Sequence, residues 1–429
     1  MHYLKFIFAL SILAVALVLS APFARANPTV KFSVRIDETT TLLKEQDTVL
    51  LHGGFGEKGS PPVNDELNDL WSLPTTGSDF AEITVPSPPP ARSKHAAVAA
   101  NGKLYIFHGT QDATMRDDIW AYDPIANTWT QQPSDGTTKP AARVMAAAVT
   151  IGTDIYFFGG YAIPLTDAHM WKYDTTNGTW TQLAEHPDGE HGGHAMSVSD
   201  SQIIVYGGGD NEMWKYDPPS NTWTQMLPLT GTPPTFLYGA AFPLTSSQMP
   251  SSMFGIAGGY DASFDETASA YRFWRVAENT FSFAPLPSLA QTRTNFAAAG
   301  WDTGSGTFKI VAAGGAHENN PIDATEFFTV PICNIKPVKP TLVYPSDTAK
   351  IKAARPTLQW NSAECAAKYQ VTVREGSAAG KIVFQAKNLH DVQVRTTALT
   401  RGKTYYWQVQ AINANGLSKS AWRKFTVKL

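Results

Sequence analysis

The chain has 429 residues, a formal net charge of −3, and 43% hydrophobic and 11% aromatic residues. This composition excludes an intrinsically disordered protein, and the length leaves room for two or three domains or for one repeat array with a companion. The 12 tryptophans, 32 glycines and 29 prolines favour many short strands joined by tight turns.

Residues 1–26 have the pattern of a secretory signal peptide. Lys5 precedes an apolar stretch from Phe6 to Leu19, and Ala24-Arg25-Ala26 provides the small residues of a cleavage site. An uncleaved anchor is the alternative, but the apolar run is short for a membrane span. We therefore expect a secreted or periplasmic protein with no membrane span after signal cleavage.

The charge is divided unevenly between two parts of the chain. Residues 27–332 contain 16 basic and 33 acidic residues, whereas residues 333–429 contain 16 basic and 4 acidic residues. Such asymmetry concerns partners and docking rather than the fold. The basic part could dock on the acidic part or on an external anionic surface, and both possibilities stay open. We predict no nucleic-acid partner, because aromatic residues are not interleaved with this basic patch.

A hydrophobic run that ends in a glycine pair recurs six times between residues 50 and 315. The first glycines are separated by 56, 50, 48, 51 and 56 residues, and they are Gly53, Gly109, Gly159, Gly207, Gly258 and Gly314. In the second unit, Thr110 stands where the second glycine is expected. A period near 50 residues predicts repeated supersecondary units rather than one irregular core.

Each glycine pair is followed by an aromatic strand, and in the second to fifth units a turn and another aromatic residue come next. The third and fourth units show this best, with Trp171-Lys172-Tyr173-Asp174 and Trp214-Lys215-Tyr216-Asp217 leading to Trp180 and Trp223. Alternating apolar and polar residues predict four short antiparallel strands per unit. The pattern resembles the kelch repeat, which implies a β-propeller.

The resemblance implies an all-β fold in which residues 27–332 form a six-bladed kelch β-propeller. The spacing places the inner strand of the first unit at Thr39 to Lys44 and leaves Val30 to Ile36 as an additional strand. The sixth unit reaches Pro331 before an outer strand can form. We therefore expect the N-terminal strand 30–36 to close the last blade.

After a linker at residues 333–339, residues 340–429 resemble a fibronectin type III-like β-sandwich. Trp360 matches the core tryptophan of its second strand, and Leu399, Gly402 and Tyr405 match its tyrosine corner. In that fold, Cys333 and Cys365 would occupy neighbouring places. An even cysteine pair in an exported protein is typical of a disulfide bond, which we predict here.

One face of a propeller carries the loops that lead into the inner strands and the loops that follow the glycine pairs. The lead-in loops contain the predicted ligand-binding residues, which are Arg92, His95, Arg143, His191, His194, Tyr238 and Arg293. A ring of Arg and His on an acidic body could hold a carboxylate of an acidic glycan or peptide. Alternatively, the arginines cap the blade ends and pair with local acids.

We predict no metal and no cofactor. His191 and His194 lie in a Gly-rich loop with no obvious third ligand. Galactose-oxidase-like copper enzymes also join a kelch propeller to an immunoglobulin-like domain, but they need a cysteine inside the propeller. Cys333 lies beyond the last propeller strand, so the sequence argues against that class.

The main prediction is an exported, monomeric, non-catalytic protein that binds a protein or glycan, possibly anionic, on the loop face. The alternative is a sugar-modifying enzyme, because periplasmic sialic acid mutarotases are similar in being exported six-bladed kelch proteins. That resemblance implies a pocket Glu and Arg, for which Arg92, Arg143 or Arg293 with Glu190 or Glu318 are candidates. A third hypothesis is structural, with the basic C-terminal part anchoring the acidic propeller. No catalytic residue is assigned.

Overall fold

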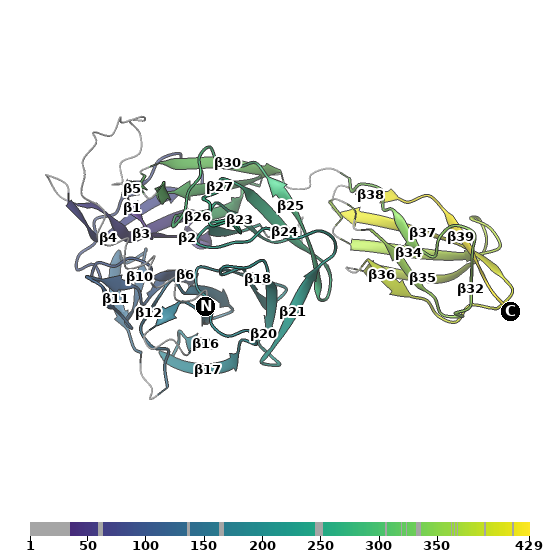
Figure 1. The fold of residues 1–429 in the computed structure, drawn as a ribbon, viewed down its shortest axis with the longest axis horizontal. Helices are drawn as coiled ribbons and strands as arrows, with labels where there is room; N and C mark the ends of the chain where they lie inside the picture. Colours follow the sequence, from purple (N-terminus) through teal and green to yellow (C-terminus); the bar gives the residue numbers. More distant parts are fainter. Residues whose placement is uncertain are drawn as a thin grey trace.

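The computed structural model describes residues 35–58, 63–134, 138–162, 167–244, 252–304, 307–318, 320–322, 324–331, 336–361, 363, 365–366, 368–389, 392–413 and 416–429. A ring of β-sheets forms the larger part, and a smaller group of sheets lies beyond β25 and β30 (Figure 1). Over these residues, no helix has the length and apolar character needed to cross a membrane. The predicted signal peptide at residues 1–26 lies outside the described residues.

Within the described residues, six blades follow one another along the chain. The first blade comprises β2 (Thr39–Leu43), β3 (Thr48–Lys58), β4 (Val63–Pro74) and β5 (Ala81–Glu82). The second comprises β6 (Ala96–Ala100), β7 (Lys103–Phe107), β10 (Ile119–Asp123) and β11 (Thr128–Gln132). The third comprises β13 (Ala147–Ile151), β14 (Asp154–Phe158), β16 (His169–Asp174) and β17 (Thr179–Glu185).

The later blades follow the same plan, with an irregular junction. The fourth blade comprises β18 (Ala195–Ser199), β19 (Gln202–Tyr206), β20 (Met213–Asp217) and β21 (Thr222–Pro228). The fifth comprises β22 (Ala240–Pro243), β23 (Ser252–Ala257), β24 (Ala270–Ala277) and β25 (Thr280–Leu286). The sixth comprises β26 (Ala297–Asp302), β27 (Thr307–Ala313) and β30 (Thr325–Pro331). The outer strands β21 and β25 pair in parallel, which joins the fourth and fifth blades into one sheet.

Short strand pairs lie in the loops that follow or precede the blades. They are β8 (Thr110–Gln111) with β9 (Thr114–Met115), β12 (Arg143–Val144) with β15 (Tyr161–Ala162), and β28 (Ala316–His317) with β29 (Asn320–Pro321). They extend the loop face on which ligand binding is predicted.

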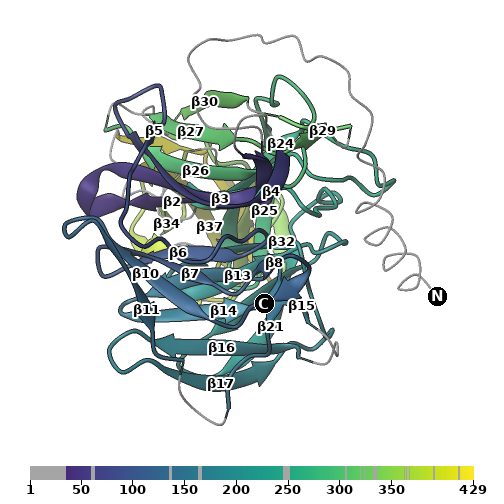
Figure 2. The same ribbon diagram turned by 90° about the vertical axis from the view of Figure 1, so that its left-hand side faces the viewer.

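The ring of blades is closed by its inner strands and by backbone hydrogen bonds. Successive inner strands contact one another in the order β2, β6, β13, β18, β22, β26 and back to β2. Figure 2 shows β26, β2, β6 and β13 of this series one after another. The residue two positions before each inner strand has a positive φ and donates its N–H to the equivalent carbonyl of the preceding blade. These bonds run from Asp37 to Asn295, Lys94 to Asp37, Met145 to Lys94, Gly193 to Met145, Tyr238 to Gly193, and Asn295 to Tyr238, at 2.8–3.3 Å. We call these six residues the mouth ring.

Aromatic residues fill the space between blades. Between the second and third blades, Phe107 and Phe157 are fully buried with ring centroids 5.7 Å apart, and Trp180 lies 5.8 Å from each. Full burial of a phenylalanine contributes roughly 1.5–3 kcal/mol. The repeated tryptophan of the outer strand therefore stabilises the packing of its blade against the neighbouring one.

The predicted N-terminal strand 30–36 lies only partly within the described residues. Its described part, β1 (Arg35–Ile36), pairs with β3 of the first blade, although Arg35 also forms a β-bridge with Ile322 of the sixth. The side chain of Arg35 is buried against Asp69 of the first blade, which accounts for this placement. In the described residues, therefore, this segment does not extend β30.

The alignment of the second glycine pair requires a correction. His108 has a φ of 58° and occupies the position that Gly53, Gly159 and the other first glycines occupy. Gly109 then donates its N–H to the Arg143 carbonyl, as Gly54 does to that of Arg92. The second unit therefore lacks the first glycine rather than the second, and Thr110 begins β8.

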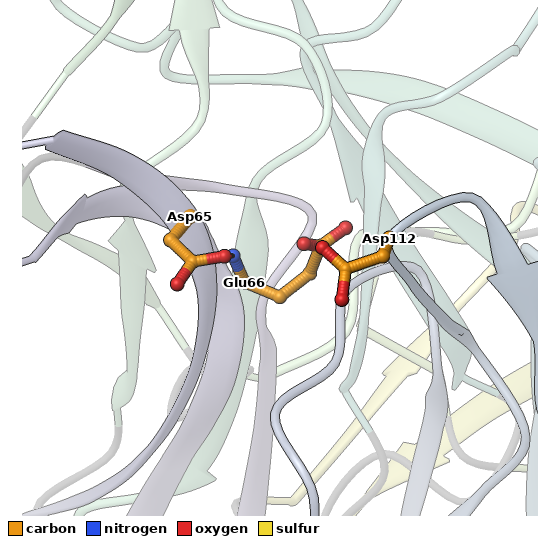
Figure 3. Close-up of side chains that lie close together, drawn as sticks. All are labelled: Asp65, Glu66 and Asp112. Carbon is orange, nitrogen blue, oxygen red and sulfur yellow. Dashed lines mark hydrogen bonds between the residues drawn. The ribbon is translucent and has the colours of Figure 1, made fainter.

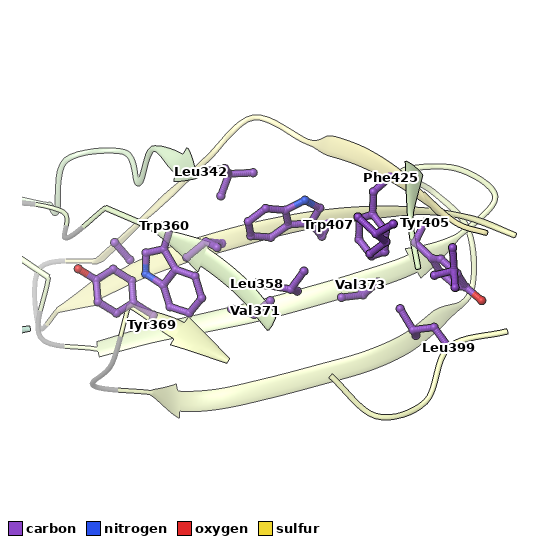
Figure 4. Close-up of a cluster of buried hydrophobic side chains, with 14 of the residues drawn as sticks. Leu342, Leu358, Trp360, Tyr369, Val371, Val373, Leu399, Tyr405, Trp407 and Phe425 are labelled. Carbon is purple, nitrogen blue, oxygen red and sulfur yellow. The ribbon is translucent and has the colours of Figure 1, made fainter. Parts of the chain in front are cut away.

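The C-terminal part contains two sheets. One contains β31 (Leu342–Tyr344), β33 (Thr357–Trp360) and β36 (Gln393–Arg395). The other contains β32 (Ala349–Ile351), β34 (Lys368–Glu375), β35 (Ile382–Leu389), β37 (Thr404–Asn413), β38 (Gly416–Lys419) and β39 (Arg423–Val427). Both sheets contribute to a single buried core, in which Trp360 and Trp407 are the largest side chains (Figure 4).

The predicted disulfide bond involves Cys333, which lies outside the described residues, so the pairing stays a prediction. Cys365 lies between β33 and β34 with a φ of 65°, and its carbonyl accepts a hydrogen bond from the Asn413 side chain at 3.0 Å.

Candidate functional site

The mouth ring brings residues from six lead-in loops to one end of the propeller axis. Lys94 Nζ lies 3.9 Å from Asp37 Oδ2, and Tyr238 and Asn295 are half-buried in the same ring. Burial raises the pKa of Asp37, while the charge of Lys94 acts to lower it. Of the predicted ligand-binding residues, only Tyr238 belongs to this ring.

Tyr238 lies in a group of three tyrosines on the loop face. Its hydroxyl donates to the Tyr161 hydroxyl at 3.3 Å, and its ring lies 6.4 Å from that of Tyr260 in an edge-on arrangement. Burial raises the pKa of Tyr238 far above its usual range. Gly193 permits this arrangement, since a Cβ at that position would lie 2.5 Å from Tyr238 Cε1.

The predicted arginines occupy equivalent positions but bind within their own blades. Arg92 donates two hydrogen bonds of 2.9 Å to the Asp118 carboxylate, and Trp120 Nε1 donates to the same carboxylate at 2.8 Å. Although burial acts to raise the pKa of Asp118, Arg92 outweighs it and holds that pKa below its usual value. We call this arrangement of arginine and acid the blade latch.

The blade latch recurs in four blades. Its buried arginine and the paired acid are Arg35 with Asp69, Arg92 with Asp118, Arg143 with Asp167, and Arg293 with Glu326. All four arginine side chains are at most 1% exposed. The guanidinium groups of Arg92, Arg143 and Arg293 are thus engaged by internal acids, and neither Glu190 nor Glu318 is the paired acid.

The predicted histidines lie in the protein interior. His95 Nε2 lies 3.2 Å from His52 Nδ1 and 2.9 Å from Thr39 Oγ1. His194 packs edge-on against Phe158, and burial lowers its pKa to about 3. Burial also lowers the pKa of His95 well below its usual value. These two imidazoles are therefore neutral at physiological pH, which does not favour anion binding.

His191 takes the arginine position of the latch in the fourth blade. Its Nδ1 lies 3.3 Å from the Gly207 carbonyl, and its ring lies 4.4 Å from that of His186. Glu212, at the acid position, accepts a hydrogen bond from Trp214 Nε1 at 3.1 Å. The fourth blade thus keeps the acid and the tryptophan of the latch but replaces the guanidinium with an imidazole.

Glu38 is a buried carboxyl group that the sequence analysis did not single out. It is 5% exposed, lies next to Asp37 of the mouth ring, and neither of its oxygens has a hydrogen-bond partner among the described residues. Burial raises its pKa to about 8. The spacing Arg35-x-x-Glu38 repeats that of Arg92-x-x-His95, so reading Arg35 as a latch arginine would have found it.

A cavity of about 470 Å³ opens on the loop face between the fourth and fifth blades. Its lining combines apolar, hydroxyl and carboxamide side chains with one carboxylate: Asn211, Thr232, Pro233, Pro234, Thr235, Phe236, Ile256, Gly258, Asp261, Ala262, Ser263, Thr267, Ser269 and Tyr271. None of the predicted ligand-binding residues lines it. The sequence did not predict this cavity, because it lies in the blade where the arginine and the acid of the latch are both replaced.

Three acidic side chains gather where β4 of the first blade lies near the turn between β8 and β9 of the second. Asp65, Glu66 and Asp112 have carboxylate oxygens within 4.8 Å of one another (Figure 3). Among the described residues, these three acids form the group whose spacing could hold a metal ion. Neither His191 nor His194 belongs to it. Asp65 and Asp112 are at least partly open to solvent, as expected for a solvated acidic surface.

Comparison with known proteins places this architecture in a family. Residues 26–208 and 131–259 match the KLHDC2/KLHL20/DRC7 kelch-repeats domain, which covers more than half of the chain. The chain therefore belongs to the kelch-repeat family, and kelch-repeat proteins generally serve as protein-binding scaffolds.

Individual relatives share shorter segments with this chain. It is 31% identical over 133 residues to N-(sulfonatooxy)prop-2-enimidothioate sulfolyase of Thlaspi arvense, covering 29% of this chain and 36% of that protein. It is 29% identical over 126 residues to the Rab9 effector protein with kelch motifs of Xenopus laevis, covering 27% and 34%. It is 31% identical over 131 residues to the flagellar outer-arm dynein alpha chain of Chlamydomonas reinhardtii, covering 30% of this chain and 3% of that protein. The chain thus spans about a third or less of these relatives.

The solved structure of YjhT is similar in fold. It aligns with a TM-score of 0.52 and 14% identity over 71% of this chain and 97% of that one. At this identity, the similarity concerns the fold alone.

Proposed function

We propose that this protein is an exported, non-catalytic binding protein that recognises a protein ligand on the loop face of its propeller. The observation that carries the proposal is the convergence of Tyr161, Tyr238 and Tyr260 beside the mouth ring. Tyrosine gives large contact area with little conformational freedom to lose, and it is enriched at protein interfaces. The protein-binding role of kelch-repeat proteins supports the same class.

The chemistry of the ligand follows from the charges on this face. The arginines of the blade latch are engaged by internal acids. Other basic side chains of the loop face, Lys94, Arg116 and Lys139, also lie within 4.0 Å of an acid, so this face does not favour an anionic ligand. A glycan ligand is the alternative outcome for the same surface, and a peptide and glycan array separates the two.

The experiment probes the full mature chain on such an array, with the double change Tyr161→Ser and Tyr260→Ser. We expect specific peptide binding that the double variant weakens at least about tenfold, as expected for a site that depends on aromatic anchors. Tyr344→Ser is the matched control, since Tyr344 is 45% exposed in the C-terminal part. Binding that survives the double change, or no binding to any ligand, contradicts the proposal.

The enzymatic alternative is a sugar mutarotase, and Glu38 is the observation that favours it. A carboxyl group with a pKa of about 8 is protonated at neutral pH and can donate a proton. NMR measurement of sialic acid anomerisation tests this. Acceleration over buffer that Glu38→Gln abolishes would replace the binding role with a catalytic one.

For the C-terminal part, we propose a fibronectin type III-like domain. The order β31–β33–β36 against β35–β34–β37–β39 supports this, as does the Tyr405 hydroxyl, which donates to the Thr400 carbonyl at 3.1 Å. Export through residues 1–26 and a Cys333–Cys365 disulfide belong to the same proposal. Cell fractionation and thiol labelling of the mature protein test them.

A further inference from the structure

The fifth blade replaces every member of the blade latch. Phe236 holds the arginine position, because its carbonyl accepts the Gly208 N–H as the Arg143 carbonyl accepts that of Gly109. Ser269 holds the acid position, since its carbonyl accepts the Gly258 N–H as the Asp118 carbonyl accepts that of His108. Tyr271, two residues further on, replaces the tryptophan.

All three replacing residues line the cavity of about 470 Å³. In the other latches, the arginine donates to the carbonyl of the first residue of the glycine turn: Arg35 to Gly53, Arg92 to His108, Arg143 to Gly159 and Arg293 to Gly314. The corresponding carbonyl of the fifth blade belongs to Gly258, which lines the cavity and accepts no hydrogen bond in the described part of the chain. The cavity thus lies where a guanidinium lies in four other blades.

The described lining residues are rich in acceptors and include no basic side chain. Asp261 is the one charged residue among them, and Thr267, Ser269 and Tyr271 add hydroxyl groups. An anion would meet a carboxylate with no compensating cation. A ligand with several N–H donors and a flat apolar face fits better, because the half-buried ring of Tyr271 offers a surface on which such a group can stack.

We propose that this cavity binds the guanidinium group of an arginine side chain presented by a protein partner. The proposal rests on the proposed protein-binding function and specifies one anchor of the partner. A planar guanidinium has five donors for the Gly258 carbonyl, the hydroxyl groups and Asp261. An ammonium group offers only three donors and no planar face.

The first test titrates the full mature chain with Nα-acetyl-L-argininamide and follows ligand saturation-transfer NMR. Nα-acetyl-L-citrullinamide is the neutral isostere, and Nα-acetyl-L-lysinamide carries the charge without the planar fork. We expect saturable binding of the arginine compound and about tenfold weaker binding of the other two, the difference that charge-assisted, planar hydrogen bonding gives. Equal binding of arginine and citrulline compounds overturns the proposal.

Two variants locate the binding in the cavity. Asp261→Asn removes the carboxylate at an exposed position and should weaken binding about tenfold. The double change Phe236→Arg and Ser269→Asp rebuilds the latch inside the fifth blade and should abolish binding. Asp112→Asn, which removes an exposed acid from the loop of the second blade, is the matched control and should change nothing. Unchanged affinity in Asp261→Asn overturns the proposal even if the rebuilt-latch variant does not fold.

Failure here is distinguishable from failure of the proposed function. If array peptides bind the loop face through the tyrosines but are insensitive to Asp261→Asn and to replacement of arginine by citrulline, the cavity proposal fails alone. If no peptide binds but argininamide does, the cavity still binds a guanidinium group, whereas the protein-binding function and the protein partner as its source both fail.

Discussion

Arg92 and Asp118 form a two-fold hydrogen-bonded ion pair inside the second blade, with both N–O distances at 2.9 Å. The Arg92 side chain is fully buried, whereas that of Asp118 is 14% exposed. The pair links the lead-in loop to the third strand of the same blade. Its counterparts in three other blades make it a recurring element of the propeller rather than a local feature.

We predict that Asp118→Ala destabilises the propeller by about 3–5 kcal/mol, because it leaves a buried guanidinium unpaired. Lys103→Ala is the control, since Lys103 pairs with Asp123 at 3.2 Å but is 42% exposed, and such pairs contribute about 0–1 kcal/mol. Urea unfolding of both variants checks the difference. Equal effects would mean that the latch is no stronger than a surface ion pair.

The raised pKa of Glu38 predicts that the folded protein loses stability as the pH rises. Its folded pKa of about 8 lies above the ordinary value of 4.5, so between these values the folded state keeps a proton that the unfolded state has lost. Each pH unit in that window then removes about 1.4 kcal/mol from wild-type stability. The free energy of unfolding of Glu38→Gln, relative to wild type, should therefore rise from pH 5 to pH 8.

The control for Glu38 is Glu318→Gln, because Glu318 is an exposed carboxyl group on the loop face. Its difference from wild type should stay constant over the same pH range. Asp37, whose pKa burial also raises and whose charge helps to raise the pKa of Glu38, is present in both variants. A constant difference for Glu38→Gln would show that this carboxyl is not protonated in the folded protein.

His108 predicts the opposite pH dependence. Burial lowers the pKa of His108 from the ordinary 6.5 to about 3. When the pH falls through this range, the unfolded state therefore binds a proton at this imidazole, whereas the folded state does not. Wild-type stability therefore falls by about 1.4 kcal/mol per pH unit because of this group. His108→Gly restores the glycine found in the other blades and removes the titration, so its stability relative to wild type should increase from pH 6.5 to pH 4.

At neutral pH, the His108→Gly variant loses the ring contact with Phe157, whose centroid lies 4.9 Å away. Glycine adopts the φ of 58° at this position without strain, which offsets about 1 kcal/mol of the stability lost with the ring contact. The pH dependence measured by thermal unfolding, not the value at one pH, is thus the diagnostic. Parallel curves for the two proteins would contradict the prediction.

The sequence was sufficient for the architecture because the glycine turns and Trp-x-Tyr-Asp strands are local patterns repeated at a constant period. Thr39–Leu43 forms the inner strand that the spacing predicted. The candidate site was harder to predict, because the same arginine that could bind a carboxylate also suits a buried pair with Asp118. Only the three-dimensional arrangement distinguishes these roles, and it also reveals that Phe236 and Ser269 stand where a latch is missing.

We predict that a side chain at Gly193 of the mouth ring would displace the Tyr238 ring of the tyrosine group. Gly193 has a φ of 67°, and a Cβ there would lie 2.5 Å from Tyr238 Cε1, so alanine must both adopt a left-handed backbone and displace the ring. Gly189, at φ 86°, has no atom within 4 Å of a built Cβ and provides the matched control. Gly189→Ala should cost about 1 kcal/mol from backbone strain alone, and Gly193→Ala at least about 2 kcal/mol more from overpacking. Urea unfolding and near-ultraviolet circular dichroism measure both effects, and equal costs with an unchanged tyrosine signal would show that the Tyr238 ring moves aside freely.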